Sequence, residues 1–116
     1  MTASDNALAM TKVANLAAEE KLGENIVALD VSKPFVLTDV FLFVSGRNER
    51  QVASIADAIE ERMHEQRFKL IRKEGKELGR WILMDYGDLI VHVMHEQERM
   101  FYDIERLWKD APVVKL

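Results

Sequence analysis

The sequence contains no cysteine among its 116 residues. Disulfide bonds, thiolate metal ligands and a cysteine nucleophile are therefore excluded. No apolar run approaches the roughly 20 residues that a membrane-spanning helix needs. The first residues, "MTASDNALAMTK", lack the basic start and the apolar block of a signal peptide, and they are too acidic for a transit peptide. These features predict a cytoplasmic protein.

A block of basic residues is also missing. The chain has 16 Lys and Arg against 20 Asp and Glu, which gives a formal net charge of −4. Nucleic-acid-binding proteins draw much of their affinity from basic side chains that neutralise phosphates. The charge therefore favours a basic protein partner over nucleic acid, although a charge of this size is also common in small domains with an unremarkable acidic surface.

The length and the order of elements predict one domain over residues 1–116, with a tail at about 110–116 after Pro112. The predicted helices span 5–22, 48–66 and 96–109, and the predicted strands span 25–31, 39–46, 68–75, 79–86 and 88–95. Ser4 and Asn48 are suitable N-caps for the first two helices. This order predicts an α/β (α+β) fold, with about three helices layered on a mixed five-stranded sheet.

Apolar residues at three- and four-residue steps predict the buried face of each helix. In the first helix the predicted stripe is Ala9, Val13, Leu16 and Ala17. In the second it is Val52, Ile55, Ala56, Ile59 and Met63. In the last it is Met100, Phe101, Ile104, Leu107 and Trp108.

A β-hairpin is predicted around Tyr86 and Gly87. A two-residue loop at these positions would place Asp85 opposite Asp88, and Trp81 opposite His92. A three-residue loop over residues 85–87, closed by a G1 bulge, is favoured because only Gly87 then needs a positive φ. This register separates the two carboxylates and weakens their interpretation as an acid/base or two-metal pair; aspartate is also a common turn residue.

No catalytic residue, cofactor site or metal site is predicted. His92 and His95 stand three residues apart on a strand, so their side chains point to opposite faces. In "FVSGRNERQ" a strand, a turn and a helix follow one another, as in an anion site at a helix N-terminus, but Gly46 is the only glycine there. The next strand lacks the paired carboxylates of a metal-dependent nucleotidyltransferase. A tight turn capped by Asn48 is the favoured interpretation.

Exposed Trp, Tyr and Arg side chains are the types that dominate protein–protein interfaces. Tyr102 lies off the buried stripe of the last helix, close to Arg99, whereas Trp81 suits a core position as well as an exposed one. The predicted partner-binding residues are Trp81, Asp85, Asp88, His92, Arg99 and Tyr102.

Three segments, "LDVS…TDVFLFVSGRNERQV", "GRWILMDYGDLIVHVM" and "ERMFYDIERLW", together resemble the iojap-like ribosomal silencing factors (RsfS). The resemblance covers about Ala7 to Pro112. It implies a sheet layout like that of nucleotidyltransferases without their catalytic carboxylates. It also implies binding to the large ribosomal subunit through ribosomal protein L-fourteen, a block on small-subunit association, and repression of translation as a stress response under nutrient limitation. Family members often form homodimers.

The positions that fit the family pattern are Trp81, Asp85, Gly87, Asp88, His92, Arg99, Tyr102, Glu105 and Trp108. Two steps depart from it. Asp39-Val40-Phe41 stands where the family has "DYF", and Phe101-Tyr102 stands where it has two tyrosines. Both departures keep the apolar shape and remove only a hydroxyl. Two alternatives stay open: a large-subunit assembly factor with the same contact, and a metal-dependent nucleotidyltransferase.

Overall fold

The computed structural model describes residues 2–116, which form nine regular elements. In chain order they are α1 (Asp5–Glu20), β1 (Glu24–Asp30), β2 (Val40–Gly46), α2 (Glu49–Glu65), β3 (Arg72–Glu74), β4 (Trp81–Asp85), β5 (Leu89–His95), α3 (Glu96–Tyr102) and the 3-10 helix η1 (Ile104–Trp108). The order predicted from the sequence is therefore confirmed, with a much shorter β3 and a divided last helix.

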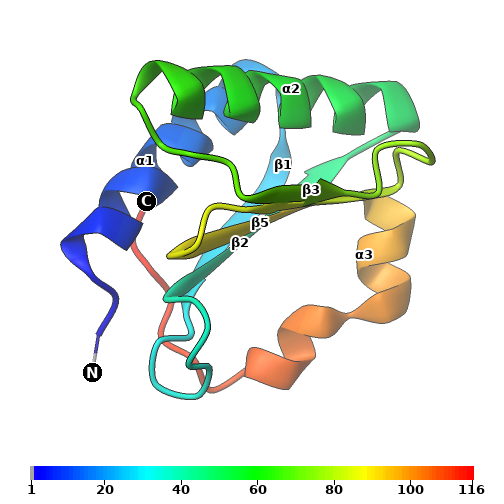
Figure 1. Cartoon of the computed structure of the whole chain (residues 1–116). Coiled ribbons are helices and arrows are strands. Elements are labelled where there is room, and N and C mark those ends of the chain that lie inside the picture. The colour runs from blue at the N-terminus through cyan, green and yellow to red at the C-terminus, as the bar shows by residue number, and fades with distance from the viewer. Residues whose placement is uncertain (1) are drawn as a thin grey trace.

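The five strands form one mixed sheet in the order β1-β2-β5-β4-β3 (Figure 1). β2 and β5 are parallel, whereas the other neighbouring pairs are antiparallel. β3 consequently runs in the same direction as β2, and α2 makes the crossover between them. All seven residues of β2 are buried, as its near-continuous apolar sequence predicts.

α1 and α2 cover one face of the sheet (Figure 1). Both predicted caps are confirmed, because Ser4 Oγ accepts from Ala7 N at 3.1 Å and Asn48 Oδ1 accepts from Gln51 N at 2.8 Å. The predicted stripe of α2 is fully buried. The stripe predicted for α1 is correct at Ala17 and in part at Val13, but it is wrong at Ala9 and Leu16, which are exposed. The buried residues of α1 are Ala7, Met10, Thr11, Ala14, Asn15, Ala17 and Ala18.

The other face of the sheet is covered only in part, by α3 and η1 (Figure 1). The predicted continuous helix over 96–109 is wrong, since Asp103 adopts a left-handed conformation with φ of 46° and ends α3. Ile104 and Trp108 pack against the sheet. The other apolar residues that the periodicity assigned to a buried face are mostly exposed: Met100 (81%), Phe101 (79%) and Leu107 (78%).

The hairpin differs from both registers considered for the sequence. Tyr86 and Leu89 close it, with Tyr86 N donating to Leu89 O at 2.8 Å, so the loop is Gly87-Asp88. Gly87 has a φ of 87° and takes the first loop position, which is the pattern of a type II′ turn. The shift has a packing cause: the ring of Tyr86 is 3% exposed and belongs to the core under the helices, which a place in the loop would not permit.

The C-terminal tail pairs with the edge of β1. Asp30 N donates to Pro112 O, and Val114 N donates to Ala28 O, both at 2.8 Å. The predicted tail therefore extends the sheet by a short stretch. Within residues 2–116, no helix has the length and apolar character to span a membrane.

Candidate interaction site

Seven rings gather on the sheet face away from α1 and α2, and we call them the aromatic face: Phe35, Phe41, Phe43, Trp81, His92, Tyr102 and Trp108. The pairings of β2 with β5 and of β5 with β4 bring the strand residues to one side of the sheet. His92 is stacked on Phe43 with ring centroids 4.9 Å apart. Trp108, from η1, lies edge-on to Phe41 at 5.3 Å.

His92 lies at the centre of the aromatic face. Its Nδ1 accepts a hydrogen bond from Trp81 Nε1 at 3.2 Å. Burial lowers the pKa of His92 to about 4, so the ring is neutral near pH 7 and carries its proton on Nε2. That Nε2 is buried and has no hydrogen-bond partner within residues 2–116. His92 is thus a packed ring that accepts a hydrogen bond from Trp81.

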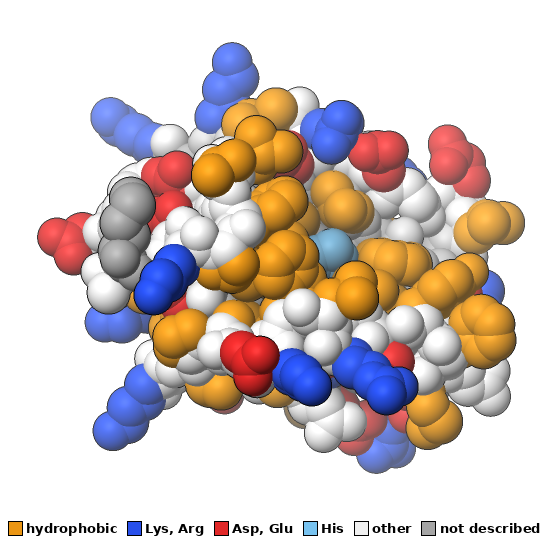
Figure 2. Space-filling view, turned by 90° about the horizontal axis from the view of Figure 1, so that it is seen from below, with side chains coloured by type: hydrophobic (Ala, Val, Ile, Leu, Met, Phe, Trp, Pro, Cys, Tyr) orange, Lys and Arg blue, Asp and Glu red, His pale blue; other side chains and the backbone are white. Residues whose placement is uncertain are grey.

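Trp81 and Tyr102 form the accessible side of this cluster. Their ring centroids are 5.2 Å apart, Trp81 is half-buried, and Tyr102 is 50% exposed. Phe101 lies edge-on to Tyr102 at 5.0 Å. Figure 2 views the molecule from this side and shows hydrophobic side chains running almost unbroken across it. Contiguous exposed apolar surface on a small domain marks an interaction site.

Arg99 belongs to α3, and internal contacts occupy its guanidinium. It donates to both carboxylate oxygens of Glu105, at 2.7 and 3.0 Å, and to Ser45 Oγ at 2.9 Å. A further bond reaches the carbonyl of Asn25 at 2.6 Å, and the group lies 5.8 Å from the centroid of the Phe43 ring. The Arg99 side chain is only 11% exposed, and it packs against the aromatic face at Phe43.

Asp85 and Asp88 lie at the far end of β4 from Trp81. Asp85 Oδ1 accepts from Gly87 N at 2.8 Å, which is the turn-forming use of aspartate. Asp88 Oδ2 accepts from the side-chain amide of Asn6 at 2.9 Å. Of the six predicted partner-binding residues, the fold therefore brings Trp81, His92, Arg99 and Tyr102 together and holds the two aspartates apart from them.

The turn that resembles an anion site is filled by the chain itself. A Cβ on Gly46 would approach Val52 N to 3.1 Å, so close packing accounts for this glycine. Arg47 pairs with Glu24 at 2.8 Å. Among the described residues, no group of three or more acidic or histidine side chains is placed to hold a metal ion.

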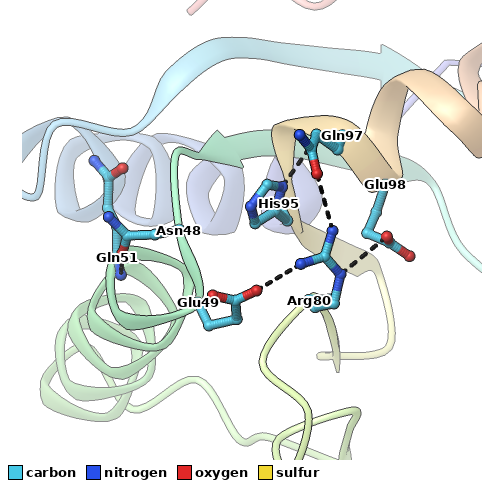
Figure 3. A network of polar contacts seen from close by, with 7 residues as sticks. All are labelled: Asn48, Glu49, Gln51, Arg80, His95, Gln97 and Glu98. Atoms are coloured by element: carbon cyan, nitrogen blue, oxygen red, sulfur yellow. Dashed lines mark hydrogen bonds and ion pairs between the residues drawn. The ribbon is translucent and has the colours of Figure 1, made fainter.

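Sequence reasoning missed a polar network at the start of α3 (Figure 3). Arg80, which precedes β4, donates to Glu49 at the start of α2 and to Glu98 on α3, at 2.5 and 3.0 Å. These bonds raise the pKa of Arg80, and the bond to Glu98 has the larger effect. His95 Nδ1 accepts from Gln97 N at 3.1 Å and caps α3. No local pattern in the sequence predicts this network, because Arg80 lies 31 positions from Glu49 and 18 positions from Glu98.

Comparisons with known proteins identify the family. The family model described as "Ribosomal silencing factor during starvation" matches residues 4–116. Ribosomal silencing factor RsfS of Bacillus subtilis is 38% identical over 111 residues, which cover 96% of this chain and 94% of that protein. The corresponding protein of Halalkalibacterium halodurans is 42% identical over 100 residues, or 86% of each chain.

A solved structure agrees with these sequence matches. The crystal structure of a Chromobacterium violaceum protein superposes with a TM-score of 0.86 at 36% identity, over 88% of this chain and 85% of that one. The family match over residues 4–116, the similar sequences and the shared fold together show that the chain belongs to the RsfS/iojap family of ribosomal silencing factors, which are non-enzymatic regulators of the ribosome.

Proposed function

We propose that this protein binds the large ribosomal subunit through ribosomal protein L-fourteen and prevents the small subunit from joining it, which represses translation under nutrient limitation. The observation that carries the proposal is the aromatic face, whose accessible side presents the exposed side chains of Met100, Phe101 and Tyr102. Aromatic and Met side chains are enriched at protein interfaces, and such a surface gains free energy when a partner covers it.

The shape of the fold supports a blocking mechanism. The aromatic face and the layer of α1 and α2 lie on opposite sides of the sheet (Figure 1). When the aromatic face is docked, the two-helix layer projects away from the large subunit. The principal-axis extents of the chain are 37 × 33 × 22 Å, a bulk that keeps two surfaces apart if it lies between them.

Charge supports a basic protein partner. With a net charge of −4, the chain is attracted electrostatically to a basic ribosomal protein. Asp85 and Asp88 then act at the margin of the contact, where charges influence the association rate and its salt dependence more than the final affinity. We place this activity in the cytoplasm, where ribosomal subunits meet.

A sucrose-gradient experiment tests this function. Purified protein is added at stoichiometric amounts to isolated large and small subunits under conditions that favour joining. We expect the joined-ribosome peak to fall, free subunits to rise, and the protein to sediment with the large subunit. An unchanged joined peak would reject the proposal. Binding to the large subunit without any effect on joining would instead favour a role in large-subunit assembly.

We further propose that the free protein forms a homodimer through the same exposed apolar surface. Leu107 and Phe101 are each more than three-quarters exposed, and pairing of two copies would remove them from water. Light scattering at micromolar concentration is expected to give twice the monomer mass of 13.4 kDa. The substitution Phe101→Asp should shift the protein to the monomer, and a wild-type protein that is only monomeric would contradict the dimer.

A further inference from the structure

α3 is not held in place by apolar burial. It has seven residues and none of them is buried. Met100 and Phe101 point largely into solvent, and Tyr102 is half-exposed. A helix this short is also unstable by itself, because helix nucleation is costly. Apart from the contact of the Tyr102 ring with Trp81, the position of the two rings that α3 presents must therefore be fixed by polar contacts.

Arg99 provides one of them. Its guanidinium ties α3 to three separate parts of the chain: Glu105 on η1, Ser45 at the end of β2, and the carbonyl of Asn25 on β1. The two-point contact with Glu105 spans the left-handed break at Asp103 and fixes the angle between α3 and η1. Only arginine can make all these bonds at once, since lysine lacks the planar fork.

Arg80 provides a second contact, to the first turn of α3 (Figure 3). Its guanidinium joins Glu98 and Gln97 of α3, at 3.0 and 3.4 Å, to Glu49 at the start of α2. The backbone adds to this contact, because His95 N donates to Arg80 O at 2.7 Å. The Arg80 side chain is 34% exposed, so this contact is more open to screening by salt than that of Arg99.

We propose that Arg80 and Arg99 are positioning residues, which clamp α3 to the start of α2, to the sheet and to η1, and so hold Phe101 and Tyr102 in the arrangement that a partner recognises. The inference rests on the proposed function, because it concerns how the same surface is presented. It also changes the role predicted for Arg99 from partner binding to positioning. In this proposal the Arg99 side chain acts through Tyr102 and makes no direct contact with the partner.

Hydrogen exchange tests the clamp without any partner. Arg99→Ala is expected to raise the exchange of the backbone amides of residues 99–108, while the amides of β2, β5 and α2 keep their protection. In Arg99→Lys, the exchange of these amides should be intermediate between that of Arg99→Ala and that of the wild type. Arg106→Ala is the matched control, because Arg106 lies on η1, is exposed, and forms no ion pair among residues 2–116. Unchanged exchange in Arg99→Ala would overturn the proposal.

Binding gives the second readout. Arg99→Ala and Arg80→Ala are each expected to weaken binding to isolated large subunits by about tenfold or more, because a loosened α3 must then be ordered, with Phe101 and Tyr102, when the partner binds. Raising the salt concentration should reduce the penalty of Arg80→Ala more than that of Arg99→Ala. Wild-type affinity in a variant whose α3 has become mobile would reject the positioning role.

The two readouts separate this inference from the proposed function. If wild-type protein fails to bind large subunits, the proposed function is wrong, and the exchange measurement still decides whether the clamp exists. If Arg99→Ala does not fold, Arg80→Ala and Arg99→Lys carry both measurements. Loss of protection throughout the sheet in all three variants would overturn the inference, because the arginines would then stabilise the whole fold and not α3 in particular.

Discussion

Replacement of Tyr102 by alanine is expected to weaken binding to the large subunit by at least thirtyfold and to remove subunit blocking at stoichiometric protein. Truncation of a central aromatic anchor costs about 2 kcal/mol or more of binding free energy, which corresponds to roughly that factor. Tyr102 is 50% exposed, and its ring contacts only the half-buried Trp81 and the exposed Phe101, so its removal should change the free energy of unfolding much less than it changes binding. Binding is measured by co-sedimentation with isolated large subunits.

Leu16→Ala is the matched control for Tyr102→Ala. Leu16 is 54% exposed, close to the 50% of Tyr102, and it lies on α1, on the other side of the sheet. It should bind as the wild type does. Trp81→Ala is expected to lose a similar amount of binding, but it also removes the donor to His92 Nδ1, so its thermal transition must be measured alongside. Wild-type affinity in both folded aromatic variants would mean that this face is not the ribosome site.

Asp88→Asn separates the centre of the surface from its margin. Asp88 lies at the hairpin end of β4 and bonds to Asn6, away from the aromatic face. Its loss is expected to reduce affinity less than the loss of Tyr102, and mainly at low salt, where a charge at the margin speeds association.

The helix patterns show where sequence reasoning succeeds and where it fails. α2 has large apolar residues at regular steps beside strongly charged ones, so its buried face was predicted correctly. α1 is rich in alanine, and alanines occur on several sides of it. The buried face of α1 contains Ala7, Ala14 and Ala18, whose small size lets the helix approach α2 and the sheet closely. The larger Leu16 lies on the exposed side.

The division of the last helix had no sequence signal. Neither glycine nor proline stands between Glu96 and Trp108, and the apolar period continues through the break. The chain turns instead at Asp103, a non-glycine residue in the left-handed region, which is uncommon outside glycine. The consequence for function is large, because the break turns Phe101 and Met100 from predicted core residues into exposed ones.

The residue types of the site were predictable, whereas their grouping was not. The side-chain types of Trp81 and Tyr102 predict a role in partner binding, and the fold places the two rings side by side. Asp85 and Asp88 are also predicted to bind the partner, but the hairpin places both at the end of β4 that lies away from Trp81. The internal bonds of Arg99 reach partners 54 and 74 positions away in the chain, a distance over which local patterns carry no information.

Acidification is expected to destabilise the protein through His92. The ordinary histidine pKa is 6.5, and burial lowers that of His92 to about 4. Between these values the unfolded chain takes up a proton that the folded chain does not, so protonation favours unfolding. The contribution of His92 to the free energy of unfolding is fully present above about pH 6.5 and is lost as the pH falls toward 4. For a side chain only 5% exposed, the difference corresponds to about 3 kcal/mol.

The measurement is the free energy of unfolding in urea at several pH values from 4 to 7.5, for the wild type and for His92→Leu. Carboxylates titrate in the lower part of this range in both proteins, so only the difference between the two curves reports on His92. His64→Gln, which removes an exposed histidine of α2, serves as the matched control and should follow the wild type. Parallel curves for the wild type and His92→Leu would contradict the prediction.

The same titration links stability to the proposed binding surface. His92 is stacked on Phe43 and accepts from Trp81, so a protonated ring must lose the Trp81 bond and find water for its charge. Because Trp81 lies over this ring and against Tyr102, the accessible side of the aromatic face should loosen before the core under α1 and α2 does. Tryptophan fluorescence is therefore expected to change at a higher pH than far-UV circular dichroism, and His92→Leu should bring the two transitions together.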